Sequence, residues 1–324
     1  MKLLQPTRRD ILKLTALAPA FALSAPARAA LGPTENQQTP AFHRFNVGDA
    51  KITVVSDGHF LTPVQNLGVN ADPAEVAAFL MSHFLSTEQS YRHTNHLFVE
   101  LGNAKVLVDV GSGNRFLETT GRLMGNLEAA GIDPDSITHV VMTHAHPDHI
   151  WGIRDDFDEP IFPDATYFIG GTEMDYWLQD DLVNRVAPED QQIVLGAANS
   201  INAEGLEWHR TNDGFEIAPG ISVMDTFGHT MGHMSLRIDS NGESLIALGD
   251  CITNAYMDLA HPEWVIARDQ DPELTVKTRK HVLDMAAADK TAILGYHFPF
   301  PGVGHVARNG ASYRFVPALW RWGQ

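Results

Sequence analysis

Hydrophobic runs rich in β-branched residues occur three times early in the chain. They cover residues 51–56, 96–101 and 104–109, and runs of this length and composition are typical of β-strands. A fourth run, 138–142, is apolar and ends immediately before the sequence THAHPDH. The pattern predicts strands at all four places, the fourth of them buried.

Helical spacing separates these strands. Asp72-Pro73-Ala74-Glu75 has the order of an N-cap, a proline at the first helical position and a capping-box glutamate. It predicts a helix that continues to about Phe84. A second helix is predicted by apolar or small residues at helical spacing followed by a glycine suited to a C-cap, and its residues are Phe116, Thr120, Leu123, Leu127, Ala130 and Gly131.

The second half of the chain repeats this alternation. Residues 171–200 predict two helices, and residues 206–248 predict strands, with turns at 212–214, 219–220 and 240–242. Asp271-Pro272-Glu273 caps a helix to about Ala288, and 291–294 predicts a last strand. Two successive halves of strands with helices predict a sandwich of two packed sheets whose outer faces are covered by helices.

The first 29 residues have the pattern of an export signal. A basic start precedes an apolar run, 11–23, which is too short to anchor the chain in a bilayer. Ala27-Arg28-Ala29 fits a cleavage site, and 7–13, TRRDILK, resembles a twin-arginine signal. We expect a twin-arginine signal at 1–29, with a Sec signal as the alternative, a linker at 30–40 and one domain at 41–324. The protein would then be periplasmic or secreted, with no stable membrane anchor.

Composition and charge restrict the classes of function. The chain has 324 residues, of which 44% are hydrophobic and 19% charged, as in ordinary globular proteins. Loss of 1–29 would remove five Lys/Arg and one Asp and change the net charge from −17 to −21. Such an acidic protein repels nucleic acid. The single cysteine, Cys251, excludes an internal disulfide, and we expect it to be buried.

Potential metal ligands gather on the turn after the strand at 138–142. His144, His146, Asp148 and His149 fall within six positions, and imidazole and carboxylate groups suit zinc, iron, manganese or cobalt. Alternate residues on a tight turn can reach one point, and the later pair can reach a second. Three later strand ends supply further ligand types, His229, Asp250 and His297.

Taken in order, these motifs resemble those of metallo-β-lactamase-fold hydrolases. The matching motifs are Asp109-Val110-Gly111, the run 144–149, Gly228-His229-Thr230, Gly249-Asp250 and His297. The resemblance implies an α/β fold, an αββα sandwich of two mixed sheets, with the metals at one edge. It also implies two divalent ions, zinc first, with manganese, cobalt or iron as alternatives. His144, His146 and His229 would hold one ion, Asp148, His149 and His297 the other, and Asp250 would bridge both.

A narrower resemblance is to the branch that contains methyl parathion hydrolase and lactonases. It involves residues 121–127, 176–178, 297–305 and 313–317, and it implies a substrate pocket that includes Phe116, Trp177 and His305. Met231 departs from the family pattern and alters a turn but no ligand. Within the narrower branch, Ile193-Val194 replaces aromatic positions and Thr253 replaces an aliphatic one, so the pocket is less aromatic. Asp109 is expected to orient a ligand histidine, or else to cap the loop that follows. His233 is expected to support its turn, and Cys251 to point away from the metals.

These observations predict a binuclear hydrolase that uses a metal-bridging hydroxide. Asp250 would hold the metal pair, and Asp148 would also orient the nucleophile or return a proton to the leaving group. The substrate would be a small lactone or ester, N-acyl homoserine lactones included, with phosphotriesters as the alternative. Two functions of other classes are the alternatives: a mono-iron dioxygenase and a non-catalytic metal-binding protein. An N-terminal arm and an aromatic surface would suit a homodimer.

Overall fold

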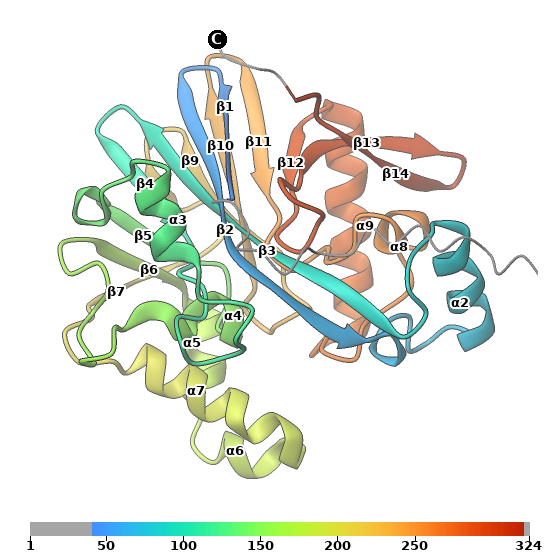
Figure 1. Cartoon of the computed structure of the whole chain (residues 1–324), viewed down its shortest axis with the longest axis horizontal. Helices are drawn as coiled ribbons and strands as arrows, with labels where there is room; N and C mark the ends of the chain where they lie inside the picture. Colours follow the sequence, from blue (N-terminus) through green and yellow to red (C-terminus); the bar gives the residue numbers. More distant parts are fainter. Residues whose placement is uncertain (1–40, 321–324) are drawn as a thin grey trace, which may run out of the picture. The chain divides into compact units, whose positions relative to one another are not determined.

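The computed structural model describes residues 41–320, and the export signal and linker predicted above lie outside them. Two seven-stranded sheets form the centre of this part of the chain (Figure 1). No helix within residues 41–320 combines the length and the apolar character needed to cross a membrane.

The first sheet contains the strands in chain order. They are β1 (Phe42–Val47), β2 (Ala50–Pro63), β3 (Gln89–Leu101), β4 (Ala104–Val108), β5 (His139–Met142), β6 (Thr166–Gly170) and β7 (Trp208–Thr211). β1 to β4 are antiparallel neighbours, whereas β4 to β7 are parallel. The carboxyl ends of the parallel strands therefore lie at one edge of the sheet.

The second sheet has the order β14-β13-β12-β11-β10-β9-β8. Its strands are β8 (Glu216–Ala218), β9 (Ile221–Asp225), β10 (Met234–Ser240), β11 (Glu243–Ala247), β12 (Ala292–Leu294), β13 (Val303–Asn309) and β14 (Ser312–Pro317). Only β11 and β12 are parallel among the pairs of this sheet that the structure describes.

The helices are α2 (Pro73–Ser82), α3 (Leu123–Ala129), α4 (Pro147–Ile150), α5 (Gly171–Trp177), α6 (Leu182–Arg185), α7 (Gln191–Ile201), α8 (Met257–Ala260) and α9 (Pro272–Asp289), with short 3₁₀ turns at Val64–Asn66, Pro134–Ser136, Trp151–Ile153 and Pro188–Asp190. Several of them cover the outer faces of the sheets. Figure 1 shows α3, α5 and α7 beside β4 to β7, and α9 beside β12 to β14.

Three buried clusters of hydrophobic residues match these layers. One lies between the two sheets and includes Val54, Leu97 and Leu236. A second joins the first sheet to its helices through residues such as Leu127, and a third joins the second sheet to α9 through residues such as Leu283. Burial of these side chains is the main favourable term in folding. The predicted αββα sandwich is confirmed.

Two helices begin where their caps predict. The Asp72 carboxylate accepts a hydrogen bond of 2.8 Å from the backbone N–H of Ala74, and Asp271 accepts one of 3.0 Å from Leu274. Each satisfies a donor that the first helical turn leaves free. Strands β1, β6, β13 and β14 were not predicted. Two helices were predicted at 171–200, and the structure has three there, α5, α6 and α7.

The helix predicted from Phe116 begins only at Leu123, so that prediction is wrong in its first half. A distant carboxylate decides the difference. Asp57 accepts hydrogen bonds from the backbone N–H groups of Ser112 (3.1 Å) and Leu123 (2.8 Å), which holds the intervening chain as a loop. Gly121 within it has φ +77°, and a Cβ there would lie 2.2 Å from the Gly113 carbonyl oxygen, so a regular helix cannot pass through it.

Candidate metal centre

The predicted ligands meet at the carboxyl ends of four strands. The short helix α4, which follows β5 and a brief loop, has His146 at its N-cap and carries Asp148 and His149. His229 lies between β9 and β10, and Asp250 and His297 come shortly after the parallel strands β11 and β12. The sandwich brings together residues that lie up to 153 positions apart in the chain, from 144 to 297.

Three imidazoles form the first group of potential ligand atoms. His144 Nε2 lies 2.9 Å from His146 Nδ1, and His229 Nε2 lies 3.1 Å from the same atom. Nitrogens that share one tetrahedral zinc ion, with bonds of about 2.0–2.1 Å, lie roughly 3.3 Å apart. Burial lowers the pKa of His144 and His146 well below the usual range, so both rings are neutral and keep a lone pair for a cation.

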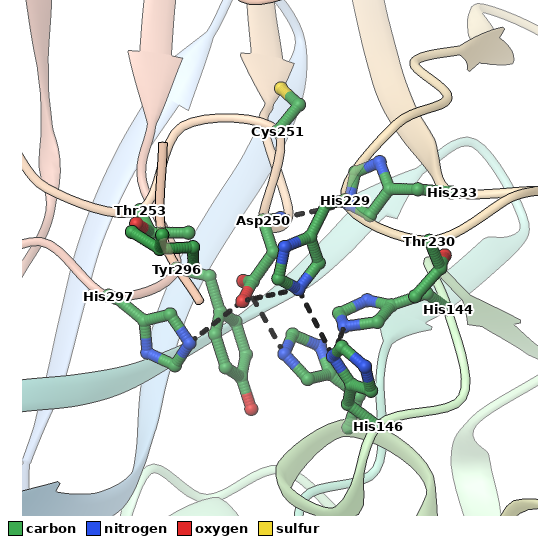
Figure 2. A network of polar contacts seen from close by, with 12 residues as sticks. His144, His146, His229, Thr230, His233, Asp250, Cys251, Thr253, Tyr296 and His297 are labelled. Atoms are coloured by element: carbon green, nitrogen blue, oxygen red, sulfur yellow. Dashed lines mark hydrogen bonds and ion pairs between the residues drawn. The ribbon is translucent and has the colours of Figure 1, made fainter. Parts of the chain in front are cut away.

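A second group lies beside the first. Asp148 Oδ2 is 3.5 Å from His149 Nε2 and 3.5 Å from His297 Nε2. The Asp250 carboxylate lies between the two groups, with Oδ2 at 3.4 Å from His229 Nε2 and 3.0 Å from His297 Nε2. Figure 2 shows this central position, with His297 and His229 on opposite sides of Asp250.

Three atoms of the site test whether a cation fits. Asp148 Oδ2, His149 Nε2 and Asp250 Oδ1 are buried and make no hydrogen bond within the described residues. A buried polar atom without a partner costs about 1–3 kcal/mol. His149 Nε2 lies 3.5 Å from each of the two carboxylate oxygens, so the three atoms face a common point. The residues fit divalent cations of the kind that imidazole and carboxylate prefer.

The charges within the site reflect this crowding of carboxylates. Burial alone would lower the pKa of His149, but Asp148, Asp109 and Asp250 outweigh it and raise that pKa well above its usual range. Burial alone would raise the pKa of Asp250, but His297 and His149 hold it well below its usual range. The cluster therefore concentrates negative charge at a buried point, as a cation site requires.

Two of the histidines are held by carboxylates that contact the ring nitrogen facing away from the site. His149 Nδ1 lies 2.7 Å from Asp109 Oδ2, and His229 Nδ1 lies 3.0 Å from Asp269 Oδ1. Asp109 also accepts hydrogen bonds from the backbone N–H and the hydroxyl of Thr143 (2.7 and 2.8 Å). Such contacts fix the tautomer and direct the opposite ring nitrogen toward the site. The contact of Asp109 agrees with its predicted role, whereas Asp269 was missed.

His233 supports the turn as expected, because its Nε2 accepts a hydrogen bond of 2.8 Å from the backbone N–H of Asp250. Burial lowers the pKa of His233 to about 3, which keeps that nitrogen free to accept. Cys251 is buried and donates to the Leu248 carbonyl oxygen at 3.2 Å, and Figure 2 shows its side chain pointing away from the cluster.

Glu173 is the second residue that the sequence did not reveal. It is fully buried on α5, and its carboxylate accepts four hydrogen bonds. The donors are Ala145 N at 2.9 Å, Trp177 Nε1 at 2.6 Å, Thr230 Oγ1 at 2.7 Å and Gly232 N at 3.0 Å. Glu173 thus ties the turn of His144 and His146 to the turn of His229.

The predicted pocket residues lie in three different environments. Phe116 reaches the site indirectly, since its ring contacts Phe60 (5.4 Å between centroids) and Phe60 contacts His297 (5.5 Å). Trp177 is buried against His146, 5.9 Å between centroids. His305 is exposed on β13 and pairs with Ala292, the first residue of β12. His297 follows the other end of β12, so the structure does not bring His305 to the cluster.

Comparison with known proteins identifies a family and several relatives. The model of the metallo-beta-lactamase superfamily matches residues 91–297. The N-acyl homoserine lactonase AiiA of Bacillus thuringiensis subsp. kurstaki is 22% identical over 176 residues, which are 54% of this chain and 62% of that protein. This chain therefore spans about three fifths of that relative. An uncharacterised protein of Mycobacterium tuberculosis is 26% identical over 226 residues, 67% of this chain and 88% of that one.

Two solved structures share the fold over most of both chains. The hydrolase AbOPH has a TM-score of 0.80 at 27% identity, with 88% of this chain and 100% of that chain covered. AidC, described as a dizinc quorum-quenching lactonase in complex with a product, has a TM-score of 0.76 at 24% identity, with 87% and 98% covered.

Proposed function

Because this chain belongs to the metallo-beta-lactamase superfamily, we propose that it is a binuclear metal-dependent hydrolase of lactones and other carboxylic esters. One observation carries the proposal: buried imidazole and carboxylate atoms face common points, and three of them have no partner among the described residues. The names of AiiA and AidC as lactonases support the choice of bond.

The distances between the candidate atoms support two ligand sets. His144, His146 and His229 would hold one ion, and Asp148, His149 and His297 would hold the other. Asp250 would bind both, because its carboxylate approaches histidines of each group. Zinc is the first choice, and manganese, cobalt and iron are the alternatives. When bound, such ions lower the pKa of a shared water and polarise the carbonyl oxygen of an ester.

The chain's own groups would then position the reaction. Besides acting as a ligand, the Asp148 carboxylate would orient the attacking water or return a proton to the leaving oxygen. Tyr296 fixes this residue, because its hydroxyl donates to the Asp148 carbonyl oxygen at 2.6 Å. The ring of Phe60 borders His297 and would limit access of bulk water.

Elemental analysis and activity of one sample test the proposal. We expect two divalent ions per chain and turnover of an N-acyl homoserine lactone and a simple aryl ester above that of a phosphotriester. The opposite ranking would favour the phosphotriesterase. One observation supports that alternative: the ring of Phe116 contacts those of Phe60 and Trp151, and such a row of rings suits an aryl leaving group. One iron per chain without hydrolysis would contradict the proposal and favour a dioxygenase.

The predicted export signal at 1–29 would direct this activity to the periplasm or the medium, which fractionation of the cells can test. The predicted homodimer is tested by the mass of the purified protein in solution.

Two matched substitutions should separate the proposed metal sites. Asp109→Asn removes the carboxylate that holds His149, and Asp269→Asn removes the one that holds His229. Loss of such a contact typically weakens metal binding about 10–100-fold. We expect the first substitution to weaken the site of Asp148, His149 and His297, and the second to weaken the site of the other three histidines.

Competition with a chelator measures the metal affinity of both sites in each variant, because the two ions are released in two successive steps. Equal weakening of both steps in both variants would contradict the assignment of each carboxylate to one site. Asp239→Asn, on the exterior of β10, is the control and should change neither step.

A further inference from the structure

Arg92 is a buried arginine without a counter-ion. It lies on β3, its residue surface is 7% exposed, and no hydrogen bond or ion pair joins it to any group within residues 41–320. Its Nε is enclosed and has no partner. A buried donor without a partner carries the uncompensated cost of its lost hydration. The Nε–H of Arg92 is therefore satisfied only when an acceptor binds beside it.

The ladder between β2 and β3 places Arg92 next to the metal centre. Arg92 is directly opposite Phe60, and such opposite residues share one face of the sheet with their Cβ atoms about 4.5–5.5 Å apart. Phe60 in turn contacts His297. His93, which follows Arg92 on β3, also contacts His297, because His297 Nδ1 donates to the His93 carbonyl oxygen at 2.7 Å.

A second donor without a partner lies on the same face. Thr62 follows Phe60 by two residues on β2, so its side chain points to the same side of the sheet. Its Oγ1 is buried and makes no hydrogen bond among the described residues. Thr62 pairs with Ser90, which makes it a diagonal neighbour of Arg92, within reach of a long side chain. A guanidinium and a hydroxyl thus face one region without an acceptor.

We propose that Arg92, assisted by Thr62, binds a carboxylate that the substrate carries away from the bond that is cleaved. This inference rests on the proposed hydrolase function and narrows its substrates to esters and lactones with an acidic substituent. A carboxylate offers two acceptor oxygens, which match the paired donors of a guanidinium. The chain as a whole carries a net charge of −17 and repels anions, so an acidic substrate needs a dedicated cation near the reacting centre.

Two aryl esters with one leaving group test the proposal. The metal-loaded full chain is assayed with phenyl butyrate, which is neutral, and with the monophenyl ester of glutaric acid, which is anionic. We expect a lower KM for the glutarate ester. Arg92→Met keeps an apolar stem without the charge, and it should raise KM for the glutarate ester roughly tenfold or more relative to KM for the butyrate. Arg92→Lys should recover part of the preference.

Arg314→Met is the control, because it removes the same charge from an exposed position on β14 and should leave both esters unaffected. An equal change for both esters in Arg92→Met, or no preference in the natural protein, would overturn the inference. If Arg92→Met does not fold, the comparison of Arg92→Lys with Thr62→Val decides: the preference must fall in Thr62→Val and survive in part in Arg92→Lys.

The inference and the proposed function can fail separately. Hydrolysis of the butyrate without a preference for the glutarate ester leaves the function intact and overturns the role of Arg92. If neither ester is hydrolysed, calorimetric binding of glutarate to the metal-loaded protein still tests Arg92. Affinity that falls roughly tenfold in Arg92→Met supports the carboxylate site, and equal affinity in both proteins overturns it.

Discussion

Replacement of Asp250 by alanine is expected to remove both metal ions and to lower kcat/KM roughly 10³-fold or more, since terms that stabilise developing charge are the largest in this type of catalysis. The reason is its central position. Its carboxylate lies 3.0 Å from His297 Nε2, 3.4 Å from His229 Nε2 and 3.5 Å from His149 Nε2, so it approaches histidines of both groups. Substitution of any one histidine would leave the other group complete.

Elemental analysis of the purified variant, together with the lactone and ester assays, measures this effect. Cys251→Ala is the matched control, because Cys251 is the next residue but packs into the cluster between the second sheet and α9. It should lose some stability and keep both ions. An Asp250→Ala protein that retains two metals per chain would refute the bridging role.

The seven proposed ligands could be found from the sequence because their signal is local. His144, His146, Asp148 and His149 are neighbours on one turn, and His229, Asp250 and His297 each follow a short apolar run that ends at or near a glycine. The ends of these strands lie close together at one edge of the sandwich. A ligand residue that directly follows an apolar run is therefore expected at that edge.

Asp269 and Arg92 were not predictable in the same way. Asp269 belongs to a loop that has no strand or helix pattern, and only the fold brings it to His229, 40 positions away. Arg92 is one charged residue in a strand, and only the pairing of β2 with β3 places it opposite Phe60. For each of them the informative quantity is a contact between distant segments, which a periodic pattern along one segment does not contain.

The same limit explains two differences at the level of elements. The spacing from Phe116 to Ala130 fits a helix, but Asp57 binds backbone groups on both sides of the loop and delays the helix to Leu123. His305 shares a continuous stretch of sequence with His297, yet the antiparallel pairing of β12 with β13 returns the chain to the opposite end of the strand. Closeness in sequence is therefore a poor guide wherever the chain reverses direction.

Glu173→Gln is expected to destabilise the protein by about 3–5 kcal/mol and to weaken the site of His144, His146 and His229 about 10–100-fold. All four contacts of the carboxylate come from donors. A glutamine would direct its own N–H groups at some of these donors, because an amide has one acceptor oxygen where the carboxylate has two. The displaced donors would be buried without partners.

Both effects have one structural cause. Ala145 lies between two of the proposed ligands, and Thr230 and Gly232 follow the third, so loss of the carboxylate frees two turns that otherwise hold their histidines at 2.9 and 3.1 Å. Urea unfolding of the metal-free variant measures the first effect, and chelator competition measures the second. Glu128→Gln, exposed on α3, is the control for the same chemical change. A Glu173→Gln protein that matches this control in both measurements would show that the turns keep their geometry without the carboxylate.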